Sequence, residues 1–413
     1  MRFTPLHREL GVGPEPITFG LVRDAIAAEV EERHDLEWKA SLPDSGGLDE
    51  FAKDVGALAN SGGGLLVYGV TEKGGGSSAA TAVQPSLVWN DAEQRRLQAV
   101  AWSSIQPPVP GLRFTPVVEV DSGNVVVFLE VPASADAPHL VSRRGSPAFT
   151  APVRYGAQTT FLSERQLDAA YRDRRAAREQ VDAELVDLAE DAMAQVRDVS
   201  SVWMTVSAVP HRPRPLHLGR VSNQEFRAVV EASRESNPVK ALMGRTFGWI
   251  HPRPGLRRWY DRDEGLDVPT SIVSIRDSGA TVWALSIDAV RDLPRAHLDP
   301  HDLQEGIAHG LWLASKASEM LNVFGEFSVR VQIHQAPDPF YIRLFEHREI
   351  LVEPAEPVHR FSSVADVLDP STEPELIRAA RGLATDVFNQ GGHTDIGDRY
   401  LVPDPESCGE LPA

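Results

Sequence analysis

The chain has 413 residues, a formal net charge of -18 at pH 7, and a composition that is 42% hydrophobic and 24% charged. This length predicts two or three domains, and the hydrophobic content suffices for a core without disulfides. The single cysteine, Cys408, excludes an internal disulfide and a cysteine-based zinc site. No apolar signal segment or run of roughly 18 apolar residues is present, so we expect a cytoplasmic protein that does not enter the membrane.

The negative charge is unevenly distributed along the chain. Residues 1–180 hold 18 basic and 23 acidic side chains, whereas the remainder holds 23 and 36. Because phosphate contacts need Lys and Arg, the whole-chain charge argues against a generic nucleic-acid binder. Any nucleic-acid contact is therefore expected at a local patch, in the less acidic N-terminal part.

The N-terminal part predicts alternating helices and strands. Apolar residues over 21–32 have helical spacing, and the next segment alternates as a strand with Glu37 and Lys39 on one face. A second helix with an apolar face is predicted over 48–59, and the continuous apolar run 65–70 indicates a buried strand. A helix over 91–105 and a hairpin with strands 114–120 and 125–131 follow in that order.

The segment from Ser163 to Asp198 has no Gly or Pro and begins with a capping box, Ser163-Glu-Arg-Gln166, so it predicts a long helix between two domains. The later sequence predicts a mixture of strands and helices. These elements are strands 202–209, 245–251, 270–276, 281–287, 326–334 and 340–346, and helices 222–233, 301–322 and 374–389.

The predicted fold class is therefore α+β. We divide the chain into an N-terminal domain (1–162), a helical linker (163–198), a second α+β domain (199–355), and a C-terminal helix with a mobile tail (356–413).

Carboxylates are placed where they could meet in the N-terminal part. Glu32 and Glu37 flank a helix-to-strand turn, and Glu72 follows the buried strand 65–70. Hard oxygen ligands of this kind suit a divalent cation, which can activate water for attack on a phosphodiester. The alternative is that these are solvated carboxylates. Asp35 and Asp54 remain substitute ligands, although Asp54 lies on a polar helix face and is expected to be solvated.

Basic residues in the same part could contact phosphates. Lys39 shares a strand face with Glu37, and Arg143, Arg144 and Arg154 form the compact basic group of this domain. Such residues position a nucleic acid without reading its sequence. The alternatives are an ion pair for Lys39 and a solvated loop for Arg143 and Arg144.

Four motifs in order over residues 20–165 resemble the Schlafen-type AlbA domain. They are Glu32-x-x-x-x-Glu37-Trp38-Lys39, Ala57-Leu-Ala-Asn60-Ser-Gly62-Gly63, Leu65-Leu-Val-Tyr-Gly69-Val70 and Val153-Arg154-Tyr-Gly156-Ala-Gln-Thr159. Vertebrate Schlafens that cut transfer and ribosomal RNA use an acidic triad, and Glu32 and Glu37 fall on its first two members. The family usually continues Gly-Val-Asp-Asp, whereas this chain has Gly69-Val70-Thr71-Glu72, so the third carboxylate is Glu72 or is missing.

The resemblance implies nucleic-acid binding, and more sharply a metal-dependent endoribonuclease acting on structured RNA such as transfer RNA, with RNA favoured over DNA. Glu32, Glu37 and Glu72 would hold Mg²⁺ or Mn²⁺, and the role could be in stress or phage defence. The alternative is a non-catalytic DNA-binding regulator or assembly module whose C-terminal domain senses a signal, binds a protein or forms a homo-oligomer. A nucleotide-binding enzyme is disfavoured, because the glycine runs lack the P-loop Lys-Ser/Thr.

Two other groups of residues in the second domain have side chains that could form sites. His297, His301 and His309 are candidate metal ligands, but Pro300 interrupts the helical spacing, so a helix start at Asp299 or Pro300 is favoured over a metal site. Trp283 and Trp312 are expected in the core.

Overall fold

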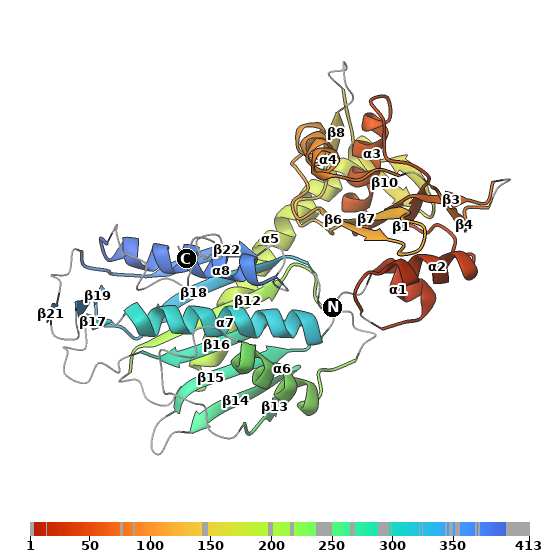
Figure 1. Ribbon diagram of the computed structural model, residues 1–413. Coiled ribbons are helices and arrows are strands. Elements are labelled where there is room, and N and C mark those ends of the chain that lie inside the picture. Colours follow the sequence, from red (N-terminus) through yellow and green to blue (C-terminus); the bar gives the residue numbers. More distant parts are fainter. Residues whose placement is uncertain are drawn as a thin grey trace, which may run out of the picture. The chain divides into compact units, whose positions relative to one another are not determined.

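The computed structural model consists of two compact units, Met1–Arg178 and Glu179–Ala413 (Figure 1). Both contain helices and sheets, which confirms the predicted α+β class. Across the described part of the chain, no helix is both long and apolar enough to span a membrane. The structure describes residues 4–13, 15–74, 77–85, 87–142, 148–196, 201–214, 219–236, 250–264, 269–287, 297–298, 300–321, 323, 325–342, 345–346, 350–351, 356–367, 370 and 372–393.

The first unit is built on a four-stranded sheet of order β1-β2-β7-β6, in which β1 and β2 are parallel and the other pairs antiparallel. Its strands are β1 (Leu36–Lys39), β2 (Gly64–Tyr68), β3 (Val70–Glu72), β4 (Ala80–Val83), β5 (Ile105–Gln106), β6 (Arg113–Val118), β7 (Val125–Val131), β8 (Leu140–Ser142), β9 (Phe149–Thr150), β10 (Pro152–Tyr155) and β11 (Gln158–Phe161). Its helices are α1 (Pro5–Leu10), α2 (Phe19–Ala27), α3 (Leu48–Asn60) and α4 (Asp91–Ser104).

Both faces of this sheet are covered by apolar side chains. One core includes residues of α3 and α4 against Leu66 and Leu129, and the other includes residues of α1 and α2 against Trp38 and Phe128. Trp38 is completely buried, and its Nε1 donates to the Val30 carbonyl at 3.0 Å. The alternation of side chains along β1 therefore sends Glu37 to the opposite face from Trp38.

The first long helix is shorter than its apolar pattern predicted. Instead of continuing to Glu32, α2 ends at Ala27, and Glu29 has a left-handed backbone with φ of 48°. After this turn, Glu31 pairs with Ala79, which lies just before β4. Val30 is buried after this turn, and for that reason the apolar spacing expected of a helix continues to residue 30 in the sequence. Glu32 thus lies on an extended segment beside β4 rather than at a helix end.

The helix α5 (Glu164–Met193) contains the boundary between the two units. Its first part matches the start predicted at Ser163. Its final turns carry Leu185, Leu188 and Ala192, which are buried in the second unit against Val282 and Ala284. The same part carries carboxylates that pair with sheet residues, such as Asp187 with Arg276.

The second unit contains a seven-stranded antiparallel sheet of order β13-β14-β15-β16-β12-β18-β22 within the described residues. Its strands are β12 (Trp203–Pro210), β13 (Arg253–Gly255), β14 (Arg258–Glu264), β15 (Pro269–Arg276), β16 (Thr281–Ser286), β18 (Phe327–His334) and β22 (Ser362–Val367). Shorter strands are β17 (His297–Leu298), β19 (Tyr341–Ile342), β20 (Phe345–Glu346) and β21 (Ile350–Leu351), and the helices are α6 (Asn223–Ser236), α7 (Pro300–Met320) and α8 (Glu373–Gln390).

Helices α6, α7 and α8 contribute to a large core on one face of this sheet (Figure 1). Trp283 and Trp312 are buried in that core, as predicted. Most of the predicted strand 245–251, namely 245–249, lies outside the described residues, as does the predicted tail after residue 393.

Candidate functional site

Glu37 is buried between two basic side chains. It is 6% exposed, and its Oε1 lies 2.5 Å from Lys39 Nζ. Its Oε2 lies 2.9 Å from Arg154 Nη1, which comes from β10. Because burying a carboxylate is costly unless it is paired, these two contacts stabilise Glu37 inside the unit.

Asp54 joins the same network from α3. Its Oδ2 lies 3.1 Å from Lys39 Nζ, and Asp54 is 2% exposed. The prediction that Asp54 is solvated is therefore wrong: the polar face of α3 packs over Lys39 of β1 instead of facing water. Burial, followed by the charge of Glu37, raises the pKa of Asp54 to about 6, whereas Lys39 acts in the opposite direction.

Glu32 lies beside the start of β1 and is partly buried. Its Oε1 accepts a hydrogen bond from the Trp38 backbone N–H at 3.0 Å, and its own backbone N–H donates to Ser78. Burial raises the pKa of Glu32 to about 7 against the lowering effect of the Trp38 N–H, and the charges of Glu72 and Glu37 raise it further. The charges of Glu72 and Glu37 thus disfavour the ionisation of Glu32.

Glu72 is at the exposed end of β3, where it pairs in register with Ala80 of β4. Since Glu32 also adjoins the segment leading into β4, both carboxylates belong to one edge of the unit. The ligand atoms of Glu32, Glu37 and Glu72 do not form a group that lies mutually within 4.8 Å. Glu37 is held by its two cations, whereas Glu72 is free to change rotamer because it is exposed.

The end of α3 holds β10 in place, a role that sequence reasoning missed. Asn60 Nδ2 donates to the carbonyls of His139 and Pro152 at 2.9 and 2.8 Å, and its Oδ1 accepts from the His139 N–H at 2.6 Å. Ser61 Oγ accepts from the Arg154 N–H at 2.7 Å. A polar pair directly after a buried helix is a signal for such connections.

The predicted basic residues differ in accessibility. The Lys39 side chain is 30% exposed, whereas that of Arg154 is 3% exposed. Arg154 Nη1 also donates to Thr159 Oγ1 at 3.3 Å, and its Nε and Nη2 are buried without a hydrogen-bond partner. Arg143 and Arg144 lie outside the described residues. Lys39 is therefore the residue of this set, within the described structure, that has direct access to solvent.

A different cluster in the second unit was not found from the sequence. His211, Glu326 and Asp366 place one ligand atom each within 4.8 Å of the others. The sequence offered His297, His301 and His309 as candidates instead; of these, His309 stacks on Trp283 with ring centroids 4.9 Å apart. No local spacing links His211 to the two acidic residues, because only the strand order brings them together.

Comparison with known proteins gives one family match. The family model described as Schlafen, AlbA_2 matches residues 32–163. A similar solved structure is the N-terminal domain of an ATP-dependent DNA helicase RecG-related protein from Nitrosomonas europaea, with 18% identity and a TM-score of 0.26, covering 36% of this chain and 94% of that one. Another is the DIP2311 protein from Corynebacterium diphtheriae, with 17% identity and a TM-score of 0.23, covering 35% of this chain and 26% of that one. No curated protein sequence matches.

Proposed function

We propose, from the match of residues 32–163 to the Schlafen, AlbA_2 family model, that the chain is a nucleic-acid-binding, divalent-metal-dependent endoribonuclease. Its substrate would be structured RNA such as transfer RNA, which would place its work in the cytoplasm. An RNA-cutting activity of this kind suits a stress or phage-defence effector.

The gathering of carboxylates at Glu32 is the observation that carries the proposal. A partly buried carboxyl whose pKa is raised to about 7 by burial and by Glu72 and Glu37 is typical of a functional site. The charge of Arg154 lowers the pKa of Glu32 but does not cancel this effect, so a cation would find carboxylate oxygens of the type that suits Mg²⁺ or Mn²⁺. Glu32, Glu37 and Glu72 would hold the cation, which would activate water and neutralise charge on the phosphodiester.

The basic residues would position the RNA backbone. Lys39 is bound to Glu37 and Asp54 yet remains partly exposed, so its ammonium can also contact a phosphate. Arg154 is buried and would act indirectly, by fixing the orientation of Glu37. Arg143 and Arg144 are proposed as further backbone contacts. Lys39, Arg143 and Arg144 would together form the local basic patch that an acidic chain needs in order to bind a nucleic acid.

The proposal is tested by incubating total transfer RNA with the full chain in Mn²⁺ or Mg²⁺, with an EDTA control. Glu72→Gln is the sharpest variant, because Glu72 is exposed and its replacement leaves the buried ion pairs intact. Glu31→Gln is the matched control, since Glu31 is an exposed carboxylate next to Glu32. We expect metal-dependent cutting by the wild type and Glu31→Gln, reduced by 100-fold or more in Glu72→Gln and Glu37→Gln. Cutting that persists in EDTA or in both site variants would contradict the proposed site.

A second candidate is the non-catalytic regulator or assembly module. Its support is the pairing of Glu37 with Lys39 and Arg154, because these two cations balance the charge of the carboxylate without a metal. In that case the second unit would sense a signal, bind a protein or form a homo-oligomer. Retained nucleic-acid binding with no cutting under any metal condition would favour this candidate, and a comparison of duplex DNA with transfer RNA would then identify the preferred ligand.

A further inference from the structure

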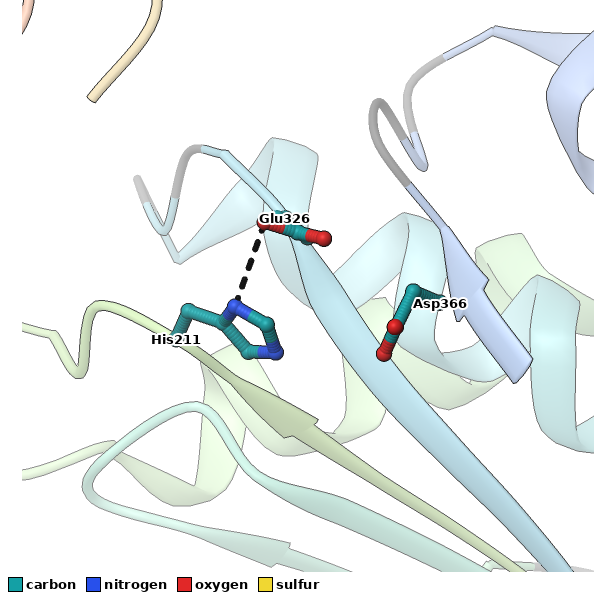
Figure 2. A group of neighbouring side chains, drawn as sticks. All are labelled: His211, Glu326 and Asp366. Atoms are coloured by element: carbon teal, nitrogen blue, oxygen red, sulfur yellow. Dashed lines mark ion pairs between the residues drawn. The ribbon is translucent and has the colours of Figure 1, made fainter. Parts of the chain in front are cut away.

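Three side chains that can bind a metal meet where three neighbouring strands of the second unit's sheet begin or end. His211 directly follows β12, Glu326 directly precedes β18, and Asp366 is the penultimate residue of β22 (Figure 2). Because β18 runs antiparallel to both β12 and β22, its start adjoins the ends of the other two strands. The cluster is therefore formed by strand pairing between residues that are far apart in the sequence.

The backbone fixes the positions of these residues. The His211 N–H donates to the Glu326 carbonyl at 2.9 Å, which extends the β12–β18 ladder by one step. Ser328 stands opposite Asp366 in the β18–β22 register. Side chains that project from a hydrogen-bonded sheet are held more rigidly than side chains on loops, so the relative placement of the three groups is set by the fold.

Hydrogen bonds define the tautomer of His211. Its Nε2 lies 2.7 Å from Ser328 Oγ, and Ser328 Oγ donates to Asp366 Oδ1 at 2.6 Å. A carboxylate only accepts hydrogen bonds, so the single hydroxyl proton of Ser328 is used on Asp366. Ser328 must then accept from the Nε2–H of His211, which leaves the lone pair of a neutral imidazole on Nδ1.

This lone pair faces a carboxylate. Nδ1 of His211 lies 3.2 Å from Glu326 Oε2, as the dashed line in Figure 2 marks, and makes no hydrogen bond. Two acceptors at this distance repel each other unless a positive charge lies between them, either a proton on Nδ1 or a bound cation. Two ligands at about 2.0–2.2 Å from one tetrahedral Zn²⁺ ion are themselves about 3.3–3.5 Å apart, which is close to the observed separation.

We propose that His211 Nδ1, Glu326 and Asp366 form a binding site for a divalent transition-metal ion, with Zn²⁺ preferred. One imidazole and two carboxylates are a mixed nitrogen and oxygen set, which suits Zn²⁺ better than the all-oxygen preference of Mg²⁺ or Ca²⁺. Ser328 supplies the outer hydrogen bond that orients a ligating histidine. Asp366 is exposed, whereas Nδ1 of His211 is buried, so a cation would enter from the side of Asp366.

The consequence of metal binding follows from the strand order. β22 is at the edge of the sheet and is joined to β18 by one ladder. A cation shared by Asp366, Glu326 and His211 would link this edge strand to β18 and β12 through side chains as well. Zn²⁺ should therefore protect β22 from local opening, an effect independent of the carboxylates proposed in the first unit.

The test measures Zn²⁺ bound by the full chain after equilibrium dialysis, together with hydrogen exchange of the β22 amides with and without Zn²⁺. We expect Glu326→Gln, Asp366→Asn and His211→Asn each to weaken binding at this site by tenfold or more, and to abolish the Zn²⁺-dependent protection of β22. His359→Gln is the matched control, because His359 lies 2.6 Å from Asp338 in an exposed pair that belongs to no cluster of three ligands among the described residues. It should bind as the wild type does.

Glu72→Gln separates this site from the proposed site in the first unit, since it should leave the β22 protection unchanged. Equal Zn²⁺ binding and equal β22 protection in the wild type and in both Glu326→Gln and Asp366→Asn would overturn the proposal. Those two variants keep nearly the same side-chain shape, so they give a result even if His211→Asn fails to fold.

Discussion

Arg154 Nη1 lies 2.9 Å from Glu37 Oε2, and both side chains are almost completely buried. The pair joins β10 to β1, which are not neighbours in any sheet of the described residues. Removing charges from water is costly, so an ion pair in this setting is stable only while both members remain. The contact thus fixes the orientation of Glu37 and makes the acidic site sensitive to changes on β10.

Replacing Arg154 by Met should strongly destabilise the first unit. The substitution keeps much of the side-chain volume but leaves Glu37 with Lys39 as its remaining cation, and we expect a loss of about 3 kcal/mol in the free energy of opening. Hydrogen exchange of the β1 and β2 amides measures this loss. Arg23→Met is the control, because Arg23 pairs with Glu119 at 2.9 Å while 58% exposed, and its loss should cost less than about 1 kcal/mol. Equal effects of the two variants would contradict the structural role of Arg154.

Of two substitutions at Asn60, Asp is closer in shape to Asn than Ala is, yet we expect it to be the more destabilising. In Asn60→Asp, the oxygen that replaces Nδ2 would face the carbonyls of His139 and Pro152 at 2.8–2.9 Å. Asn60→Ala removes these two bonds and the one from the His139 N–H to Oδ1, but it places no charge there and should cost about 1–3 kcal/mol. We therefore expect Asp to lower the thermal transition of the first unit more than Ala does, as measured by calorimetry. The reverse order would show that the Asn60 bonds do not hold β10.

The local elements of the first unit could be predicted because they depend on patterns within short segments. The strand with Glu37 and Lys39 on one face and the hairpin of β6 and β7 are both present. Asp54 was predicted to be solvated because helical periodicity identifies a polar face but does not identify the residues that pack against it. Here the polar face meets Lys39, whose own charge makes the burial of Asp54 tolerable.

The metal-binding cluster of the second unit illustrates what a single sequence cannot give. His211, Glu326 and Asp366 have no motif spacing, and each lies at or next to the end of a strand, as many polar residues do. Their meeting depends on β18 pairing with both β12 and β22, and strand order is not encoded in local periodicity. Likewise, α2 ends at Ala27 because Glu29 takes a left-handed conformation, for which the sequence offers neither Gly nor Asn as a signal.

The entry into β2 depends on a glycine with two separate requirements. Gly63 has φ of +78°, and a Cβ there would lie 2.5 Å from the Ala133 nitrogen and 2.7 Å from the Val131 oxygen. Gly63→Ala should therefore cost about 3 kcal/mol, which combines the left-handed backbone with a clash against main-chain atoms. Gly123→Ala is the matched control, since Gly123 has φ of +73° with no atom within 4 Å of its Cβ position, and it should cost about 1 kcal/mol. Urea unfolding followed by hydrogen exchange on β2 compares the two, and similar costs would mean that β2 moves to accommodate the methyl group.

Glu32 predicts a pH dependence of stability whose sign is opposite to that of an ordinary ion-paired carboxylate. Burial raises its pKa from the usual 4.5 to about 7 in the folded chain, so the folded state binds this proton more tightly than the unfolded state does. Its contribution to stability is therefore complete below about pH 4.5 and is lost as the pH rises through about 7. After allowance for the partial exposure of Glu32, the loss should be about 1–2 kcal/mol.

The measurement compares wild type and Glu32→Gln between pH 4.5 and 8 in the presence of a chelator, using the exchange of the β1 amides. The neutral glutamine cannot titrate, so the stability advantage of the wild type should shrink across this range, whereas Glu31→Gln should follow the wild-type curve. Parallel curves for wild type and Glu32→Gln would mean that Glu32 is solvated with an ordinary pKa. In that case the mutual repulsion of Glu32, Glu72 and Glu37, on which the proposed cation site depends, would be absent.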